Sequence, residues 1–213
     1  MFGSSERSAA NPHLLIRNRA WIFRFVVASG ALTLFCSAAS PEVLAAPQGW
    51  RIDEVHTSIG FKIDAVGFPT TRGHFKHYSG RILIDFERPG KSFTTFTVES
   101  TSIDAGSESF TDFIKGPALL DVEKFPRLTF TSTQVDKVDN HTARVTGNLT
   151  MIGVTKPITL VVNVDTDPSA KDRVVAFQAI GKIARSEFGM IFGIPLIDDA
   201  IEITVKTRAL ADE

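Results

Sequence analysis

Residues 142–165 read TARVTGNLTMIGVTKPITLVVNVD, and they form two runs in which apolar and polar side chains alternate. Each run has apolar or small residues at every second position: Val145, Gly147, Leu149 and Met151, then Ile158, Leu160, Val162 and Val164. A period of two is typical of antiparallel strands with one apolar face. Gly153 lies between the runs, where a tight turn favours glycine. The stretch therefore predicts a β-hairpin.

Six further stretches alternate in the same way, at about residues 50–65, 73–86, 92–102, 127–138, 173–184 and 199–210. The hairpin strands are expected at 142–151 and 156–167, and turns are expected at 69–72 and 88–91. These make eight predicted strands, and runs of roughly ten residues are long for a globular protein. Because closure removes the exposed edges of a sheet, the sequence predicts an all-β fold, an elongated eight-stranded antiparallel barrel.

Two connections are too long or too apolar for simple turns. In the first, residues 104–126, Ser109 and Asp112 can cap a helix, while Gly116 and Pro117 end it. The apolar stripe of that helix would contain Phe110, Phe113 and Ile114. We therefore expect a short helix between the third and fourth strands, across one barrel end. The second connection, residues 185–198, is mostly apolar and is expected to fold against the protein.

The first 45 residues are expected to be a signal peptide. Arg17, Arg19 and Arg24 precede an apolar run at 25–36 that is followed by small residues, and cleavage is expected between Ala45 and Ala46. The alternative is an uncleaved membrane anchor, but a run of about a dozen residues is short for a bilayer span. The rest, residues 46–213, is expected to be one β-barrel domain, periplasmic or secreted.

The composition of residues 46–213 disfavours several classes of function. Acidic residues outnumber basic ones there, so nucleic acid is not an expected partner. The one cysteine precedes residue 46, and His74 and His77 would lie on opposite faces of a strand, so no metal site is expected. No nucleophile elbow, phosphate-binding glycine loop or dinucleotide motif is present, so we expect neither a cofactor nor a catalytic residue.

Groups of residues along the chain come in the order of one known family. They are Trp50, Ile52, Asp53, His56 and Ser58; Gly73, Phe75 and Gly80; residues 102–104; Phe125, Pro126, Leu128 and Phe130; residues 147–157; and Arg185, Ser186, Phe188 and Gly189. The chain resembles the YceI-like, lipocalin-like family of exported bacterial proteins from Trp50 to about Ala209. One departure is Thr57, which stands between His56 and Ser58, where the family usually has serine directly after histidine.

The resemblance implies a barrel longer than a lipocalin, with a tunnel that binds a polyisoprenoid or a similar long-chain amphiphile. Periodicity alone favours a core filled by side chains, as in many small barrels, whereas the resemblance favours a tunnel. The candidate lining residues are Phe61, Ile63, Tyr78, Ile82, Phe96, Val98, Leu128, Phe130, Leu149, Leu160, Val162, Phe177, Ile203 and Val205, with Phe113 and Phe188 as lids.

Arg185 and Ser186 are candidates for a polar mouth, because arginine can hold a pyrophosphate head group with two hydrogen bonds. In the alternative, which we favour, Arg185 pairs with Asp53, Asp104 or Asp112 and ties loops over the mouth. His56 follows Asp53 by three residues, a spacing that separates side chains on a strand, so we expect His56 to be buried and hydrogen-bonded.

Three classes of function follow from these patterns. The first is a non-enzymatic carrier or store of a long-chain lipid. In the second, a cluster of Asp53, His56 or Asp104 transforms a bound isoprenoid. In the third, the apolar residues 188–197 dock on a membrane-associated partner. A symmetric homodimer is expected only from the general frequency of such assemblies.

Overall fold

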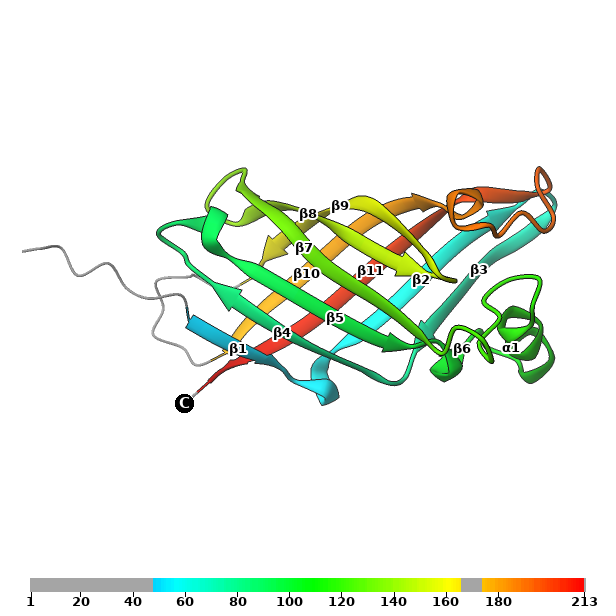
Figure 1. Cartoon of the computed structure of the whole chain (residues 1–213), viewed down its shortest axis with the longest axis horizontal. Helices are drawn as coiled ribbons and strands as arrows, with labels where there is room; N and C mark the ends of the chain where they lie inside the picture. Colours follow the sequence, from blue (N-terminus) through cyan, green and yellow to red (C-terminus); the bar gives the residue numbers. More distant parts are fainter. Residues whose placement is uncertain (1–47, 166–173, 213) are drawn as a thin grey trace, which may run out of the picture. The chain divides into compact units, whose positions relative to one another are not determined.

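The computed structural model describes residues 48–165 and 174–212 (Figure 1). The expected signal peptide at 1–45 lies outside the described residues. Within the described ranges, eleven strands form one antiparallel sheet, in the order β1-β4-β5-β7-β8-β9-β10-β11-β2-β3-β6. The sheet is closed because β1 also pairs with β11, with Trp50 opposite Ala211. The expected all-β barrel is confirmed.

Five of the eight positions in the barrel wall are filled by single long strands. These are β7 (Arg127–Lys137), β8 (Thr142–Met151), β9 (Val154–Val164), β10 (Val174–Ala184) and β11 (Ile197–Ala211). Each matches a predicted strand within three residues at either end. The predicted hairpin at Gly153 is confirmed, since Ile152 and Gly153 have φ values of 51° and 73° and Met151 pairs with Val154. Long, uninterrupted alternation thus gives long strands.

The other three wall positions each consist of two shorter strands. They are β1 (Gln48–Ile52) with β2 (Ser58–Ala65), β3 (Phe68–Phe75) with β4 (Tyr78–Ile84), and β5 (Phe93–Glu99) with β6 (Ile103–Asp104). The 3₁₀ turns η1 (Glu54–His56) and η3 (Ser100–Ser102) interrupt the first and third, and η2 (Pro89–Lys91) joins β4 to β5. The interruptions adjoin one another, because the Lys76 amide donates to the Ser102 carbonyl at 3.1 Å.

Several predictions for this region are wrong in detail. The strand expected at 73–86 is divided between β3 and β4, and the strand expected at 92–102 ends at Glu99, where η3 follows. The first strand is not continuous, because the Asp53 carboxylate accepts the Val55 amide at 3.0 Å and begins η1. The first reversal of the chain is at Val66 and Gly67 rather than at 69–72, because Gly67 adopts φ 75°, a left-handed conformation that glycine tolerates. Pro69 fits within β3, since β6 pairs with β3 only at His74 and Phe75 and demands no amide from Pro69.

The single α-helix of the described residues is α1 (Glu108–Lys115), in the connection where a helix was expected. Its N-cap is Ser107 rather than Ser109, and the Ser107 hydroxyl accepts the Phe110 amide at 3.4 Å. Figure 1 shows α1 beside the β2–β3 hairpin and the loop before β11. We call this the helical end of the barrel. The opposite end, where β1 begins and β11 finishes, is the terminal end.

Two apolar clusters pack the wall of the barrel. The larger joins the inward faces of the strands to residues beneath α1 and includes Phe130, Leu149 and Met190. The smaller lies at the terminal end around Trp50, Val175 and Ala209. Side chains bound the middle of the barrel but do not fill it.

Candidate functional site

The barrel encloses a cavity of about 970 Å³, which is at the upper end of the usual size range for ligand sites. Its lining includes Ile84 and Val164 near the terminal end and Phe68 and Phe192 at the helical end. Along β11 the lining runs from Ile197 to Thr207, which corresponds to roughly 25 Å along the axis at the usual strand rise and tilt. The cavity is therefore long, narrow and mainly apolar.

Fourteen of the sixteen residues that are candidates for the tunnel lining or its lids lie on the cavity wall. They are Phe61, Ile63, Ile82, Phe96, Val98, Phe113, Leu128, Phe130, Leu149, Leu160, Val162, Phe177, Ile203 and Val205. Phe113 lies on α1, and the other thirteen come from all eight wall positions. Inward residues of neighbouring strands stand opposite one another, as Phe96 and Phe130 do.

Tyr78 and Phe188 are not part of the lining. The Tyr78 hydroxyl donates to the carbonyls of Thr57 and Glu54, at the interruption of the first wall position. Burial, followed by the charges of Glu54 and Asp53, raises the pKa of Tyr78. Phe188 ends the 3₁₀ turn η4 (Arg185–Phe188), and it is only 1% exposed within the larger apolar cluster. Both side chains support the wall instead of facing the cavity.

Arg185 lies on the cavity wall, but its guanidinium is directed to the loop that follows it. Only 2% of the residue is exposed, and its nitrogens donate to three carbonyls: Nε to Asp198 at 2.9 Å, Nη1 to Met190 at 2.6 Å and Nη2 to Ile197 at 3.1 Å. Burial lowers the pKa of Arg185, against the opposing charges of Asp199 and Asp198. The arrangement ties the loop, and it does so through carbonyls rather than through Asp53, Asp104 or Asp112.

Ser186 has a separate role next to Arg185. Its amide and hydroxyl both donate to the Asp199 carboxylate, at 2.8 and 2.7 Å. The bonds from Ser186, first from its hydroxyl and then from its amide, lower the pKa of Asp199. Ser186 is not among the residues of the cavity wall. The two candidates for a polar mouth thus hold the start of β11 to η4.

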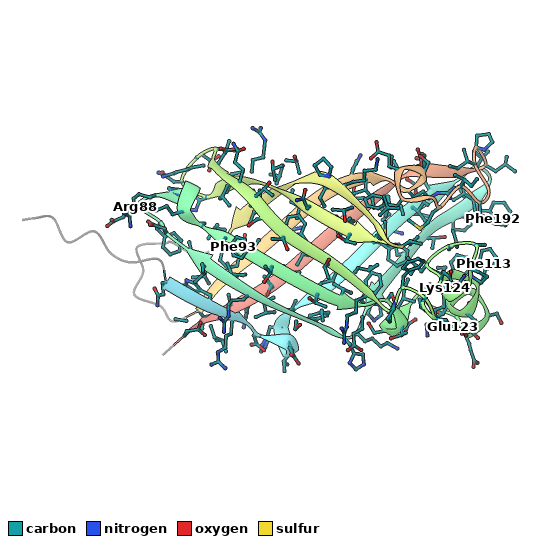
Figure 2. All side chains as sticks on the ribbon, viewed as in Figure 1. Arg88, Phe93, Phe113, Glu123, Lys124 and Phe192 are labelled. Carbon is teal, nitrogen blue, oxygen red and sulfur yellow. The ribbon has the colours of Figure 1, made fainter. Side chains whose placement is uncertain are left out.

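Aromatic side chains close over the helical end of the cavity. The rings of Phe113, on α1, and Phe192, in the loop before β11, meet edge to face with centroids 5.2 Å apart. Phe110 stacks beside Phe113 at 6.4 Å. Figure 2 shows Phe113 and Phe192 together at this end, with Arg88 and Phe93 at the other. All three rings line the cavity and are also partly exposed to solvent, so they form the boundary between the two.

The terminal end of the cavity is more polar. Its lining includes Asp85, Lys137, Asp139 and His141. Asp85 is buried and binds the Arg88 guanidinium at 2.9 to 3.0 Å. Burial raises the pKa of Asp85, but the hydrogen bonds from the Arg88 amide and side chain outweigh it and leave the pKa lowered. The two ends of the cavity therefore differ in polarity.

Alternation along the predicted strands did not identify these end residues, because the start of β3, the helix α1, turns and loops supply them. Phe68, Phe110 and Phe192 at the helical end and Asp85 and His141 at the terminal end all lie outside the predicted lining. For the helical end a signal was available in the sequence, since residues 188–197 contain no charged side chain. For the terminal end the sequence offers only ordinary turn residues.

The titratable groups considered for catalysis lie elsewhere. The expectation of a buried His56 is wrong: its side chain is 51% exposed, and its Nδ1 lies 2.6 Å from Asp53 Oδ2 because η1 brings residues three apart together. This hydrogen bond is the main cause of the lowered pKa of Asp53. Asp104 instead pairs with Lys76 at 2.7 Å. Neither Asp53, His56 nor Asp104 lines the cavity.

Residues 48–165 and 174–212 contain no group of three or more His, Cys, Asp or Glu side chains arranged to hold a metal ion. They also contain no helix with the length and apolar character needed to cross a membrane.

Comparison with known proteins agrees with the fold. Residues 50–209 match the model of the YceI-like domain. Protein YceI of Salmonella arizonae is 30% identical over 166 residues, which cover 76% of this chain and 86% of that protein. The YCEI protein of Campylobacter jejuni is 28% identical, with a TM-score of 0.62 over 76% of this chain and 96% of that one.

A polyisoprenoid binding domain from Saccharophagus degradans is 13% identical and shares the fold, with a TM-score of 0.61. The match covers 78% of this chain and 99% of that one. Since the family model covers most of the barrel, the chain belongs to the YceI-like family.

Proposed function

We propose that this protein is an exported, non-enzymatic binding protein that carries or stores a polyisoprenoid, or a similar long-chain amphiphile, in its barrel. The observation that carries the proposal is the apolar cavity of about 970 Å³. A cavity of this shape suits a flexible hydrocarbon chain better than a compact metabolite. The polyisoprenoid binding domain of S. degradans, which has the same fold, supports the choice of ligand class.

The affinity would come mainly from the hydrophobic effect. Each methylene moved from water into an apolar site contributes ~0.8 kcal/mol. Binding must offset the lost freedom of ligand and protein, a cost of roughly 4–15 kcal/mol. A chain of about twenty carbons or more exceeds that cost without any strong polar contact. The fourteen predicted lining residues on the cavity wall are the proposed contacts for the chain.

The polar head group is proposed to lie at the terminal end. Arg185, the earlier candidate for the head group, uses all three of its nitrogens on loop carbonyls. Asp85, His141 and Asn140 line the opposite end and offer hydrogen-bonding groups there. An amphiphile would then place its tail near Phe113 and Phe192 and its head toward the β4–β5 and β7–β8 turns.

A carrier fits the geometry better than an enzyme does. The Asp53–His56 pair has the geometry of an acid/base pair, but it lies outside the cavity lining. A lipid held inside the barrel would therefore not meet it. Export to the periplasm or beyond is part of the proposal and is supported by the arginine-rich, apolar leader in the sequence.

The direct test is native purification followed by organic extraction and mass spectrometry. We expect a long-chain lipid in stoichiometric amount, or its uptake when the delipidated protein is offered polyprenols. If the protein is recovered without lipid and takes up neither polyprenols nor quinones, the proposal is refuted. Chemical change of the lipid that is lost in His56→Ala would instead indicate an enzyme.

A further inference from the structure

We propose that the helical end of the barrel docks on a zwitterionic lipid bilayer and exchanges the bound chain directly with it. The inference rests on the proposed function and adds the surface and the partner. The surface in question consists of the exposed apolar side chains of residues 66–68, 110–113 and 191–196, which we call the portal surface. Closing an apolar cavity does not require apolar side chains on the outer surface, so their exposure needs another explanation.

The portal surface is unusually apolar for a surface in water. Phe68, Ile191 and Leu196 are 76%, 69% and 67% exposed. They belong to one surface, because the Val66 amide donates to the Leu196 carbonyl at 2.8 Å and the rings of Phe113 and Phe192 touch. Large contiguous apolar patches on soluble proteins mark sites of interaction with proteins or membranes.

The surface is continuous with the interior of the barrel. Phe68, Phe110, Phe113 and Phe192 are partly exposed and also line the cavity. A hydrocarbon chain leaving the cavity at this end therefore contacts apolar side chains until it leaves the protein. Exchange into a hydrocarbon phase placed against the portal surface would keep the chain out of water throughout.

The backbone of the main loop is suited to an apolar environment. Residues 188–197 carry no charge, and at least six of the nine carbonyls of residues 189–197 accept hydrogen bonds within the protein. Unsatisfied backbone groups are costly in lipid, so internal bonding lowers the cost of entering the bilayer interface. Interfacial elements commonly insert by roughly 5–10 Å, a depth that protruding loop tips can reach.

Charges beside the portal surface select the type of bilayer. Asp64, Glu187 and Asp198 are exposed next to the loops, and α1 adds Glu108 and Asp112 against one lysine, Lys115, in its last turn. These carboxylates oppose an anionic membrane but complement the ammonium groups of zwitterionic lipids. We therefore expect phosphatidylethanolamine and phosphatidylcholine surfaces to bind, and anionic lipid to weaken binding, the reverse of a basic membrane-binding surface.

The test is flotation of the mature protein with vesicles of phosphatidylcholine and phosphatidylethanolamine, using the variant Ile191→Asp/Leu196→Asp. Neither side chain lines the cavity, so uptake of a fluorescent prenyl probe in the absence of vesicles should be unchanged. We expect vesicle binding and the rate of probe transfer to vesicles to fall by about ten-fold or more. Val55→Asp/Val161→Asp is the matched control, since both valines are exposed outside the portal surface, and it should behave as wild type.

Each arm has a decisive outcome. Absence of wild-type vesicle binding, or equal binding by the Ile191→Asp/Leu196→Asp variant, overturns the docking proposal. Stronger binding to vesicles containing anionic phosphatidylglycerol overturns the choice of a zwitterionic surface. A stable dimer on gel filtration that this variant dissociates would assign the surface to a second copy of the chain instead. If the wild type takes up no prenyl probe in the absence of vesicles, the proposed function is refuted, whatever the result for vesicle binding.

Discussion

The substitution Ala179→Trp should narrow the middle of the cavity. Ala179 lies on β10 and lines the cavity, and its partners Val162 and Val205 on the neighbouring strands also line it. Because alanine has the smallest side chain among these neighbours, an indole at this position enters the space enclosed by the wall. It would cross the path of a chain that runs between the two ends.

The expected loss of affinity follows from the contacts that the indole displaces. If the ring excludes about three methylenes of the bound chain, the loss is ~2.4 kcal/mol at ~0.8 kcal/mol for each. That corresponds to roughly 50-fold weaker binding. The stability of the protein should not fall in parallel, because the indole itself buries apolar surface. A shorter prenol, which can occupy one side of the ring, should lose less affinity than a longer one.

The assay is competition of prenols of two lengths against a fluorescent prenyl probe. Ile180→Trp is the matched control, because Ile180 is the next residue of the same strand, is partly exposed and is not part of the lining. A folded Ala179→Trp protein, verified by circular dichroism and a urea midpoint near that of the wild type, is required. Wild-type affinity in that folded variant would refute the placement of the chain in the cavity.

Three further outcomes are expected. Arg185→Ala should lower the free energy of unfolding in urea by about 3–5 kcal/mol, since three carbonyls lose the donor that a buried guanidinium supplies. It should weaken binding of a prenol and of its pyrophosphate equally, and a selective loss for the pyrophosphate would restore a head-group role. Gly147→Ala should cost about 1–3 kcal/mol, because its Cβ would lie 2.5 Å from the Phe130 ring, whereas Gly90→Ala should be nearly neutral. Asp199 has a lowered pKa, so its carboxylate stabilises the folded protein fully above the unfolded-state pKa near 4, and this stabilisation is lost as the pH falls further. Urea midpoints measured from pH 6 to pH 3 should therefore fall less steeply in Asp199→Asn than in the wild type.

The regular part of the barrel could be predicted from the sequence because it depends on alternation alone. From β7 to β11 each strand is paired along most of its length, and one face must be apolar throughout. The first three wall positions break this rule through local hydrogen bonds. A side chain such as Asp53 can begin a turn by accepting a hydrogen bond from one backbone amide, and a pattern of hydrophobicity contains no information about that bond.

The same reason explains which site residues were found. Successive side chains of a strand point to opposite faces, so alternation predicts which ones face inward. Leu160 and Val162 were identified in this way, and both line the cavity. Phe188 lies beyond the end of its strand, in η4, where this alternation no longer applies. The aromatic contact between Phe113 and Phe192 joins segments about eighty residues apart, and no local pattern encodes such a contact.

The position of Arg185 links the closure of the cavity to the nature of the portal surface. A loop as apolar as residues 188–197 gains from contact with hydrocarbon only if its carbonyls do not need water. Arg185 satisfies three carbonyls from within the barrel wall, at Met190, Ile197 and Asp198, and so removes that need. A lysine would supply one ammonium point charge in place of a planar group that reaches three carbonyls. From the sequence, Arg185 is a candidate for a head-group contact, with the loop-tying role favoured. The structure shows a loop-tying role, and in the proposed docking this buried charge makes an uncharged loop compatible with lipid on its outer side.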